Sequence, residues 1–288
     1  MASSVKALGP MSAMDTFCRD AVCGDMPPDL DPVSLADLHE ALGLSRIQAH
    51  YQPIVRIHDR APVAVEVLAR LAHPTRGMVL PDLFVPQLED AGLALPLTKS
   101  VSRAAFAEWR DGLTGHLGLA LALNFPLDVL LMPKALTWLD EQRAEAGIPA
   151  EHLVIELTES RPVRQVVKLG RAVARLRRQG YRLAIDDVGP DLRDHRALLA
   201  LDFSSLKLDK DLVRRALRCP DAAGFLGETL TAARRAGMAV VAEGVADAAL
   251  WAHVAALGID HAQGYHVARP MVAACVPSWR QLWTGVPA

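Results

Sequence analysis

Short apolar runs of strand character recur along this chain, and a stretch of helical pattern follows most of them. Alternation of strands with helices is typical of a parallel sheet that is wrapped by its own crossover helices. Eight such runs predict one α/β domain, a TIM-like (β/α)8 barrel, and 288 residues are enough for one. The predicted strands are Ala49–Ile57, Pro62–Leu71, Leu117–Phe125, Leu153–Glu159, Arg182–Val188, Ser205–Leu208, Met238–Gly244 and Ile259–Tyr265.

Helical periodicity fills most of the intervals between these runs. The predicted helices are Leu93–Asp111, Leu127–Ala146, Pro162–Gln179, Leu192–Leu201, Asp221–Ala236 and Ala246–Leu257. The first interval is different, because only His58 to Ala61 separate the first two strands. Four residues cannot form a crossover helix but can form a hairpin turn, so we expect the first strand to run antiparallel to its neighbour.

Residues 1–33 have no clear hydrophobic period and are expected to form a leader. Ser34 then offers a helix N-cap with Asp37 three positions later, and a short amphipathic helix is predicted over residues 34–43. Its apolar face is expected to pack on the domain, and docking of a partner is the alternative. We therefore divide the chain into a leader with a short helix, residues 1–47, and a barrel domain, residues 48–288.

The charge balance excludes several classes of partner. Lys and Arg number 31 and Asp and Glu 33, a formal net charge of −2, so direct nucleic-acid binding and an anionic membrane surface are not expected. Four cysteines without a C-x-x-C pair favour a reduced compartment, which we take to be the cytoplasm. No apolar window of about 18 residues is free of charge, so no membrane span is expected.

Polar residues occur where the predicted strands end, which is the face of such a barrel that holds the active site. Alone, each has an ordinary explanation as a solvated or turn residue. Together they indicate either bound metal or raised pKa values, because carboxylates set among apolar residues repel one another unless metals or protons neutralise them. These residues are Glu66, Asn124, Glu156, Glu159, Asp186, Asp187, Lys207, Asp209, Glu243 and Gln263.

Oxygen ligands of this kind suit two Mg²⁺ or Mn²⁺ ions better than zinc. The first of the adjacent residues Asp186 and Asp187 could bridge both ions, an arrangement that suits in-line displacement at a phosphodiester. Lys207, between two leucines, would hold the attacking water or offset phosphate charge.

With these motifs in order, the chain resembles the EAL-domain phosphodiesterases, which cleave the bacterial second messenger cyclic di-GMP to linear pGpG. The resemblance covers roughly residues 48–275 and rests on motifs spread along that length. They are Tyr51-Gln52-Pro53-Ile54-Val55, Glu66-Val67-Leu68-Ala69-Arg70, His73-Pro74, Pro81-Asp82-Leu83-Phe84-Val85-Pro86, Asn124, Glu156-Leu157-Thr158-Glu159-Ser160, Asp186-Asp187-Val188-Gly189, Leu206-Lys207-Leu208-Asp209, Ala242-Glu243-Gly244-Val245, Gln263-Gly264-Tyr265 and Arg269-Pro270.

The resemblance implies a role for each matching residue. One metal would be held by Glu66, Asn124, Glu156 and Asp186, and the second by Asp186, Asp187 and Glu243. Glu243 would also be the general base, Lys207 the cation that positions water, and Gln263 and Asp209 supporting polar groups near the hydrated metals. Gln52 and Arg70 would contact the dinucleotide, Leu68 and Pro86 would line its groove, and Glu159 would anchor the loop after the fifth strand.

Departures from the family pattern concern that loop above all. Where the family has Asp-Asp-Phe-Gly-Thr-Gly-Tyr-Ser-Ser, this chain continues from Asp187 with Val-Gly-Pro-Asp-Leu-Arg-Asp. Ala246 also replaces a second glutamate, and the signature reads Glu-Val-Leu instead of Glu-Ala-Leu. The predicted metal ligands are complete, but a changed supporting shell can cost about 10- to 100-fold in activity.

The leading hypothesis is therefore a metal-dependent cyclic di-GMP phosphodiesterase. The alternative is a degenerate relative that binds cyclic di-GMP with little or no hydrolysis and acts through a regulatory protein partner. A regulator that has lost the nucleotide is a third hypothesis, and retention of Gln52, Arg70 and the predicted ligands argues against it. By the same resemblance, a homodimer is expected through the segment near the altered loop.

Overall fold

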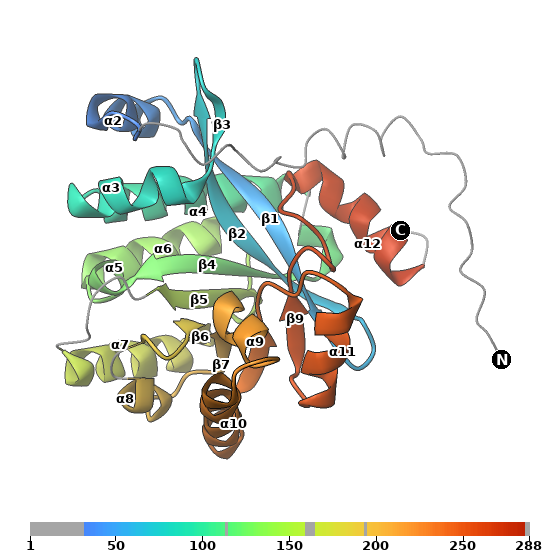
Figure 1. The fold of residues 1–288 in the computed structure, drawn as a ribbon. Coiled ribbons are helices and arrows are strands. Elements are labelled where there is room, and N and C mark those ends of the chain that lie inside the picture. Colours follow the sequence, from blue (N-terminus) through green and yellow to red (C-terminus); the bar gives the residue numbers. More distant parts are fainter. Residues whose placement is uncertain (1–31, 113–114, 159–164, 193–194, 286–288) are drawn as a thin grey trace, which may run out of the picture.

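The computed structural model describes residues 32–112, 115–158, 165–192 and 195–285, and one hydrogen-bonded sheet organises them (Figure 1). Its strands follow the order β1-β9-β8-β7-β6-β5-β4-β2-β3, and a further pairing of β1 with β2 closes the first eight into a barrel. The strands are β1 (Ile47–Arg56), β2 (Pro62–His73), β3 (Gly77–Val79), β4 (Ala120–Pro126), β5 (Leu153–Thr158), β6 (Arg182–Val188), β7 (Ser205–Leu208), β8 (Ala239–Ala242) and β9 (His261–Gln263).

Strand β1 runs antiparallel to both of its neighbours, β2 and β9. The six other pairs around the barrel, from β2–β4 to β8–β9, are parallel. This confirms the predicted (β/α)8 barrel with an antiparallel first strand. The short β1–β2 connection is the cause, since it can only reverse the chain.

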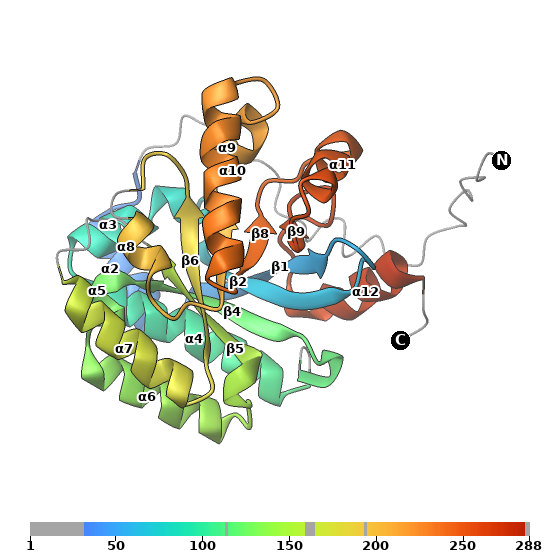
Figure 2. The same ribbon diagram turned by 90° about the horizontal axis from the view of Figure 1, so that it is seen from below.

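Helices cover the outside of the strands (Figure 2). Those described are α2 (Leu35–Gly43), α3 (Val85–Asp90), α4 (Ala94–Arg110), α5 (Leu127–Leu130), α6 (Pro133–Glu145), α7 (Val166–Arg178), α8 (His195–Leu199), α9 (Lys210–Arg215), α10 (Pro220–Arg235), α11 (Ala248–Ala256) and α12 (Val276–Thr284). None of the helices in the described ranges is both long enough and apolar enough to cross a bilayer.

The single helix predicted over Leu127–Ala146 is wrong, because the structure divides it into α5 and α6. Pro133 begins α6, and the residue before it, Met132, is extended at φ −89° and ψ 109°. A proline disfavours helical geometry in the preceding residue but fits the first turn of a helix, so it separates the two. The short elements β3, α3, α9 and α12 were not predicted.

The predicted N-terminal helix is observed as α2. The side chain of Ser34 caps it by accepting a hydrogen bond from the backbone N–H of Asp37 at 3.1 Å. Leu38 and Ala41 are buried in a hydrophobic cluster that also contains Leu71 of β2. The apolar face of α2 therefore packs on the barrel, as expected.

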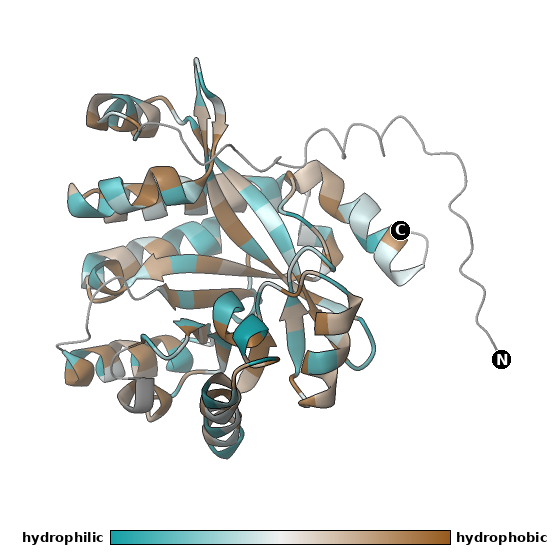
Figure 3. Cartoon of the chain, viewed as in Figure 1, coloured by the Kyte–Doolittle hydropathy of each residue, from teal (hydrophilic) through white to brown (hydrophobic). Residues whose placement is uncertain are grey.

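The two faces of the barrel strands bury different residues. Large side chains such as Leu121 and Ile155 belong to the main core, and Figure 3 shows hydrophobic segments along β4 and β5 with hydrophilic positions between them. The alternate positions form a separate cluster of mainly small residues inside the barrel: Ile54, Ala64, Ala120, Ala122, Val154, Ala184 and Val241. Because side chains alternate along a strand, the next inward position lies two residues further on.

Candidate functional site

A polar layer lies directly above the small residues inside the barrel. Two residues after Ala64, Val154 and Ala184 come Glu66, Glu156 and Asp186, all buried. Parallel register places Asn124 beside Glu156 on the neighbouring strand. Strand alternation alone thus brings the predicted carboxylates to one level of the barrel.

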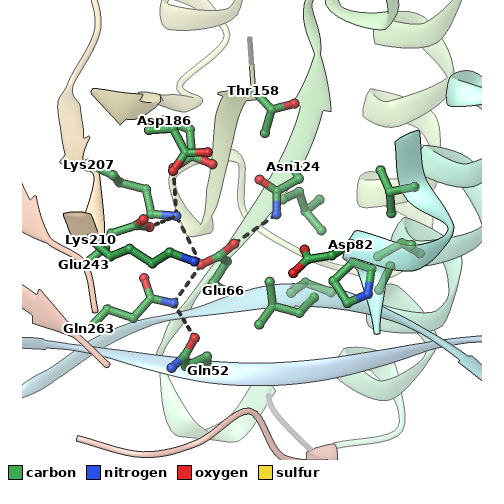
Figure 4. Close-up of a pocket in the computed structure, with 18 of the residues that line it drawn as sticks. Gln52, Glu66, Asp82, Asn124, Thr158, Asp186, Lys207, Lys210, Glu243 and Gln263 are labelled. Atoms are coloured by element: carbon green, nitrogen blue, oxygen red, sulfur yellow. Dashed lines mark hydrogen bonds and ion pairs between the residues drawn. The ribbon is translucent and has the colours of Figure 1, made fainter. Parts of the chain in front are cut away.

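Lys207 of β7 lies at the centre of this layer (Figure 4). Its Nζ is 3.1 Å from Glu66 Oε2, 3.1 Å from Glu156 Oε2, 3.0 Å from Asp186 Oδ1 and 2.6 Å from Glu243 Oε1. The side chain of Lys207 is only 2% exposed, so one ammonium group contacts four carboxylates away from bulk water. We name these five residues the Lys207 cluster.

Two amide side chains fix the orientation of Glu66 in the Lys207 cluster. Asn124 donates from Nδ2 to Glu66 Oε1 at 3.0 Å, and Gln263 donates from Nε2 to Glu66 Oε2 at 2.7 Å. Gln263 also contacts Gln52 Oε1 at 3.2 Å, and Gln52 in turn donates to the carbonyl of Ala268 at 3.1 Å. The predicted residues of β1, β2, β4 and β9 therefore form one hydrogen-bonded chain.

A bulge in β6 explains how two consecutive aspartates serve the same site. Neighbouring residues of a regular strand point to opposite faces, but the pairing of β6 with β7 shifts between Ile185 and Val188. Asp187 within this bulge has φ +51°, a left-handed conformation that aspartate tolerates better than most residues. Carboxylate oxygens of Asp186, Asp187 and Glu243 consequently lie within 4.8 Å of one another.

Burial and mutual repulsion shift the pKa values of these groups. Burial raises the pKa of Glu243 to about 8, with Lys207 opposing the shift and Asp186 adding to it. Burial and the charge of Asp186 raise the pKa of Asp187 to about 6. Burial would also raise the pKa of Glu66, but Lys207 and the two amides outweigh it and hold that pKa below its usual value. The negative charge of the carboxylates in this site therefore exceeds the single positive charge of Lys207.

These residues fit the two divalent cations that the resemblance implies. Besides the three converging carboxylates, the buried Asn124 Oδ1 accepts no hydrogen bond from the described residues. A buried carbonyl oxygen without a donor is costly, and a hard cation would satisfy it. Glu66, Asn124, Glu156 and Asp186 could hold one ion, and Asp186, Asp187 and Glu243 a second.

A cavity of about 640 Å³ opens above the Lys207 cluster. Of the predicted binding residues, Gln52, Leu68 and Pro86 line it, and its further wall comes from α3 and α4. This volume falls in the range of small-molecule sites. Most of the lining residues from α3 and α4 are apolar, and the barrel side carries the carboxylates of the Lys207 cluster. With cations bound at these carboxylates, the cavity suits a ligand with both flat apolar and anionic parts.

Three of the predicted residues that the structure describes do not line the cavity, and one of them, Glu156, belongs to the Lys207 cluster. Arg70 is buried outside the lining, and its Nη1 donates to the carbonyl of Ala69 at 2.8 Å. Asp209 caps α9, because its Oδ1 accepts from the backbone N–H groups of Asp211 and Leu212 at 3.0 Å. Glu159, the predicted loop anchor, is outside the described residues.

Further residues line the cavity that were not predicted as site residues, among them Asp82, Lys210, Arg214 and Tyr265. Asp82 and Tyr265 lie inside sequence motifs, and Lys210 directly follows one. Arg214 comes one helical turn after Lys210. That proximity was the available signal. Whether such a neighbour faces the cavity depends on α9 and on the segment after β9, whose geometry the motifs do not specify.

His50 of β1 gives a prediction about acid stability. It is 2% exposed, neither ring nitrogen has a hydrogen-bond partner among the described residues, and burial together with Arg70 lowers its pKa to about 4. Since unfolding restores a pKa near 6.5, His50 stays neutral in the folded protein while the unfolded chain takes up a proton. The contribution of His50 to the free energy of unfolding is therefore fully present above pH 6.5 and is lost as the pH falls towards 4. At pH 5 the loss is about 2 kcal/mol.

We expect His50→Leu to remove this loss. Urea unfolding at pH 8 and pH 5 should show a difference in free energy of unfolding that is smaller in His50→Leu than in the original protein. The exposed His58 supplies the control, His58→Leu, whose pH dependence should match the original protein. An unchanged pH dependence in His50→Leu would contradict the prediction.

Comparison with known proteins places this geometry in context. The EAL domain family model matches residues 35–270. The bifunctional diguanylate cyclase/cyclic di-GMP phosphodiesterase MucR of Pseudomonas aeruginosa is 28% identical over 83% of this chain and 35% of its own length. A cyclic di-GMP phosphodiesterase of the same organism is 29% identical over 85% of this chain and 42% of its own length. The chain therefore spans less than half of these relatives.

Solved structures show the same fold. The MucR phosphodiesterase in complex with c-di-GMP has a TM-score of 0.76 and 28% identity, covering 83% of this chain and 97% of that one. The FimX EAL domain of Pseudomonas aeruginosa bound to c-di-GMP has a TM-score of 0.72 at 22% identity, covering 82% of this chain and 96% of that one.

Proposed function

The chain belongs to the EAL domain family, and on that premise we propose that it binds cyclic di-GMP and hydrolyses it to linear pGpG with two divalent metal ions, Mg²⁺ or Mn²⁺. The observation that carries the proposal is the Lys207 cluster, four carboxylates around one buried lysine at the floor of a cavity of about 640 Å³. Relatives named as cyclic di-GMP phosphodiesterases support the substrate.

Hydrolysis requires a water oxygen to bond to phosphorus while the bond from phosphorus to the 3′ oxygen breaks. Bound at the proposed ligands, two divalent ions would polarise the phosphate and lower the pKa of the attacking water. We assign Glu243 the role of general base that takes the proton from this water, and the departing 3′ oxygen takes up one proton from solvent. The result is a free 3′ hydroxyl and a 5′ phosphate.

Lys207 holds the base in place. Its Nζ donates to Glu243 Oε1 at 2.6 Å and is shared with Glu66, Glu156 and Asp186. An ammonium group in this position aligns the carboxylate and offsets negative charge that develops on the phosphate. Gln263 supports the same geometry through its 2.7 Å hydrogen bond to Glu66.

The remaining predicted residues take binding or supporting roles. We propose that Gln52, Leu68 and Pro86, which line the cavity, contact the dinucleotide. Asp209 supports the site indirectly, because it caps the helix that begins at Lys210. Contact of Arg70 with the dinucleotide requires its guanidinium group to leave the buried position that the structure shows.

Incubation with cyclic di-GMP and either Mg²⁺ or Mn²⁺ tests the proposal. We expect pGpG to appear in the presence of metal, no product in EDTA, and no product from Glu66→Ala. Isothermal titration with cyclic di-GMP accompanies the assay. Binding without product under both metals would support the alternative, a non-hydrolysing receptor, and absence of both binding and product would overturn the proposal.

Several earlier expectations stay predictions. They are the cytoplasmic location, the homodimer, the regulatory protein partner and the division of the chain at residue 47.

A further inference from the structure

Charge is distributed unevenly among the residues that line the cavity. Six of the lining residues are acidic: Glu66, Asp82, Glu89, Asp186, Asp187 and Glu243. Three are basic: Lys207, Lys210 and Arg214. Lys207 is already engaged by four carboxylates. A cyclic dinucleotide carries two phosphate charges. Lys210 and Arg214 of α9 are the remaining basic side chains of this cavity lining that could contact a phosphate.

Lys210 is held at the cavity by an unusually close backbone approach. The segment after β8 passes against the first residue of α9, and a Cβ atom at Gly244 would lie 2.5 Å from Lys210 Cβ. Gly244 also has φ +61°, which glycine adopts without strain. The absence of a side chain at Gly244 thus lets α9 begin beside Glu243, and the side chain of Lys210 points into the cavity (Figure 4).

Both cations of α9 are available to a ligand. Lys210 is exposed and forms no ion pair with the described residues. Arg214 follows one helical turn later, so both side chains lie on the same face of α9. Its ion pair with Asp211 is long, 3.8 Å, with side chains 53% and 65% exposed, and such a pair is weak.

We propose that Lys210 and Arg214 form a phosphate-binding arm that contacts a phosphate of the bound dinucleotide at the cavity mouth. The inference rests on the proposed function and extends it, since neither residue is among the predicted metal ligands or catalytic groups. Both would act in substrate binding and not in the chemical step. Their loss should therefore raise KM and leave kcat nearly unchanged.

Equilibrium binding and steady-state kinetics test this arm. Isothermal titration of cyclic di-GMP in EDTA should give a Kd about 5- to 10-fold higher for Lys210→Gln and for Arg214→Gln, and KM with Mn²⁺ should rise by a similar factor. The Kd of both variants should also depend less on NaCl concentration, because fewer charges are screened. The matched controls are Arg215→Gln, exposed on the same helix, and Lys134→Gln on α6, neither of which lines the cavity.

The outcomes separate the two proposals. If the original protein binds and cleaves cyclic di-GMP while Lys210→Gln and Arg214→Gln match the controls in Kd and KM, the phosphate-binding arm is wrong and the enzyme assignment stands. If the original protein neither binds nor cleaves, both fail. A fall in kcat without a change in Kd or KM would also overturn the arm, since it would indicate a catalytic role.

Discussion

Lys207→Met should destabilise the protein by about 3–5 kcal/mol at pH 8 in EDTA, and it should abolish turnover. The reason is that Lys207 is the only basic side chain bonded to the four carboxylates in the described part of the chain. Removing one partner of a buried ionic network leaves the other charges uncompensated, whereas methionine preserves most of the volume. Urea unfolding of the original protein and the variant measures the difference.

The deficit should depend on pH in a defined direction. Burial already raises the folded-state pKa values of Glu156, Asp186 and Glu243 above their unfolded values, and loss of the ammonium group raises them further. Groups of this kind favour folding at low pH, and their contribution is lost as pH rises through the folded-state pKa. Glu243, whose pKa is already about 8, is the extreme case. We therefore expect Lys207→Met to be closer to the original protein at pH 5 than at pH 8.

Divalent metal provides a second readout for the same variant. Mg²⁺ or Mn²⁺ should restore part of the stability of Lys207→Met at pH 8, because a bound cation replaces the lost positive charge. Exposed Lys134→Met serves as the control and should show neither the deficit nor the metal response. Equal stability of Lys207→Met and the original protein in EDTA at pH 8 would show that the cluster does not need its cation.

Glu243→Gln should lower kcat by about 10²- to 10⁴-fold and leave the protein folded. Glutamine keeps the size of the side chain but cannot take a proton from water, and the loss of a general base has an effect of this size. Stability should be preserved, because the substitution removes a buried group whose charged form is disfavoured. Lys207 also retains its ion pairs with Glu66, Glu156 and Asp186.

Rapid-quench or steady-state assays with Mn²⁺ give kcat, and titration with cyclic di-GMP gives Kd. The variant should bind within a few-fold of the original protein, which distinguishes loss of a base from loss of the site. Glu228→Gln, on the exposed side of α10, controls for the change of charge. Normal kcat in Glu243→Gln would move the role of base to another residue, and Asp187, with a pKa of about 6, would be the next candidate.

Local pattern was sufficient for the barrel and for most of the Lys207 cluster. Alternation along each strand determines which residues face inward. Parallel strands in this register therefore place Glu66, Glu156 and Asp186 in one layer. The hairpin length determined the direction of β1 in the same way. Pro133 is the residue in the sequence that signals the boundary between α5 and α6, because a proline fits the first turn of a helix.

Local sequence patterns do not predict features that depend on contacts between several segments. The bulge that turns Asp187 towards Asp186 arises from the pairing of β6 with β7, and the capping role of Asp209 depends on α9, which was not predicted. The burial of Arg70 has the same kind of cause, since side-chain position follows from packing between strands.

The sequence by itself determined which strand carries each polar residue and that the strands form a barrel, because both follow from periodicity and loop length. Only the tertiary structure decided which charge meets which. Lys207 faces four carboxylates, while Lys210 is held at the cavity mouth by its contact with Gly244 and remains open to a ligand. Two lysines three residues apart differ in role because electrostatic partners are set by distances across the barrel, which no spacing along the chain records.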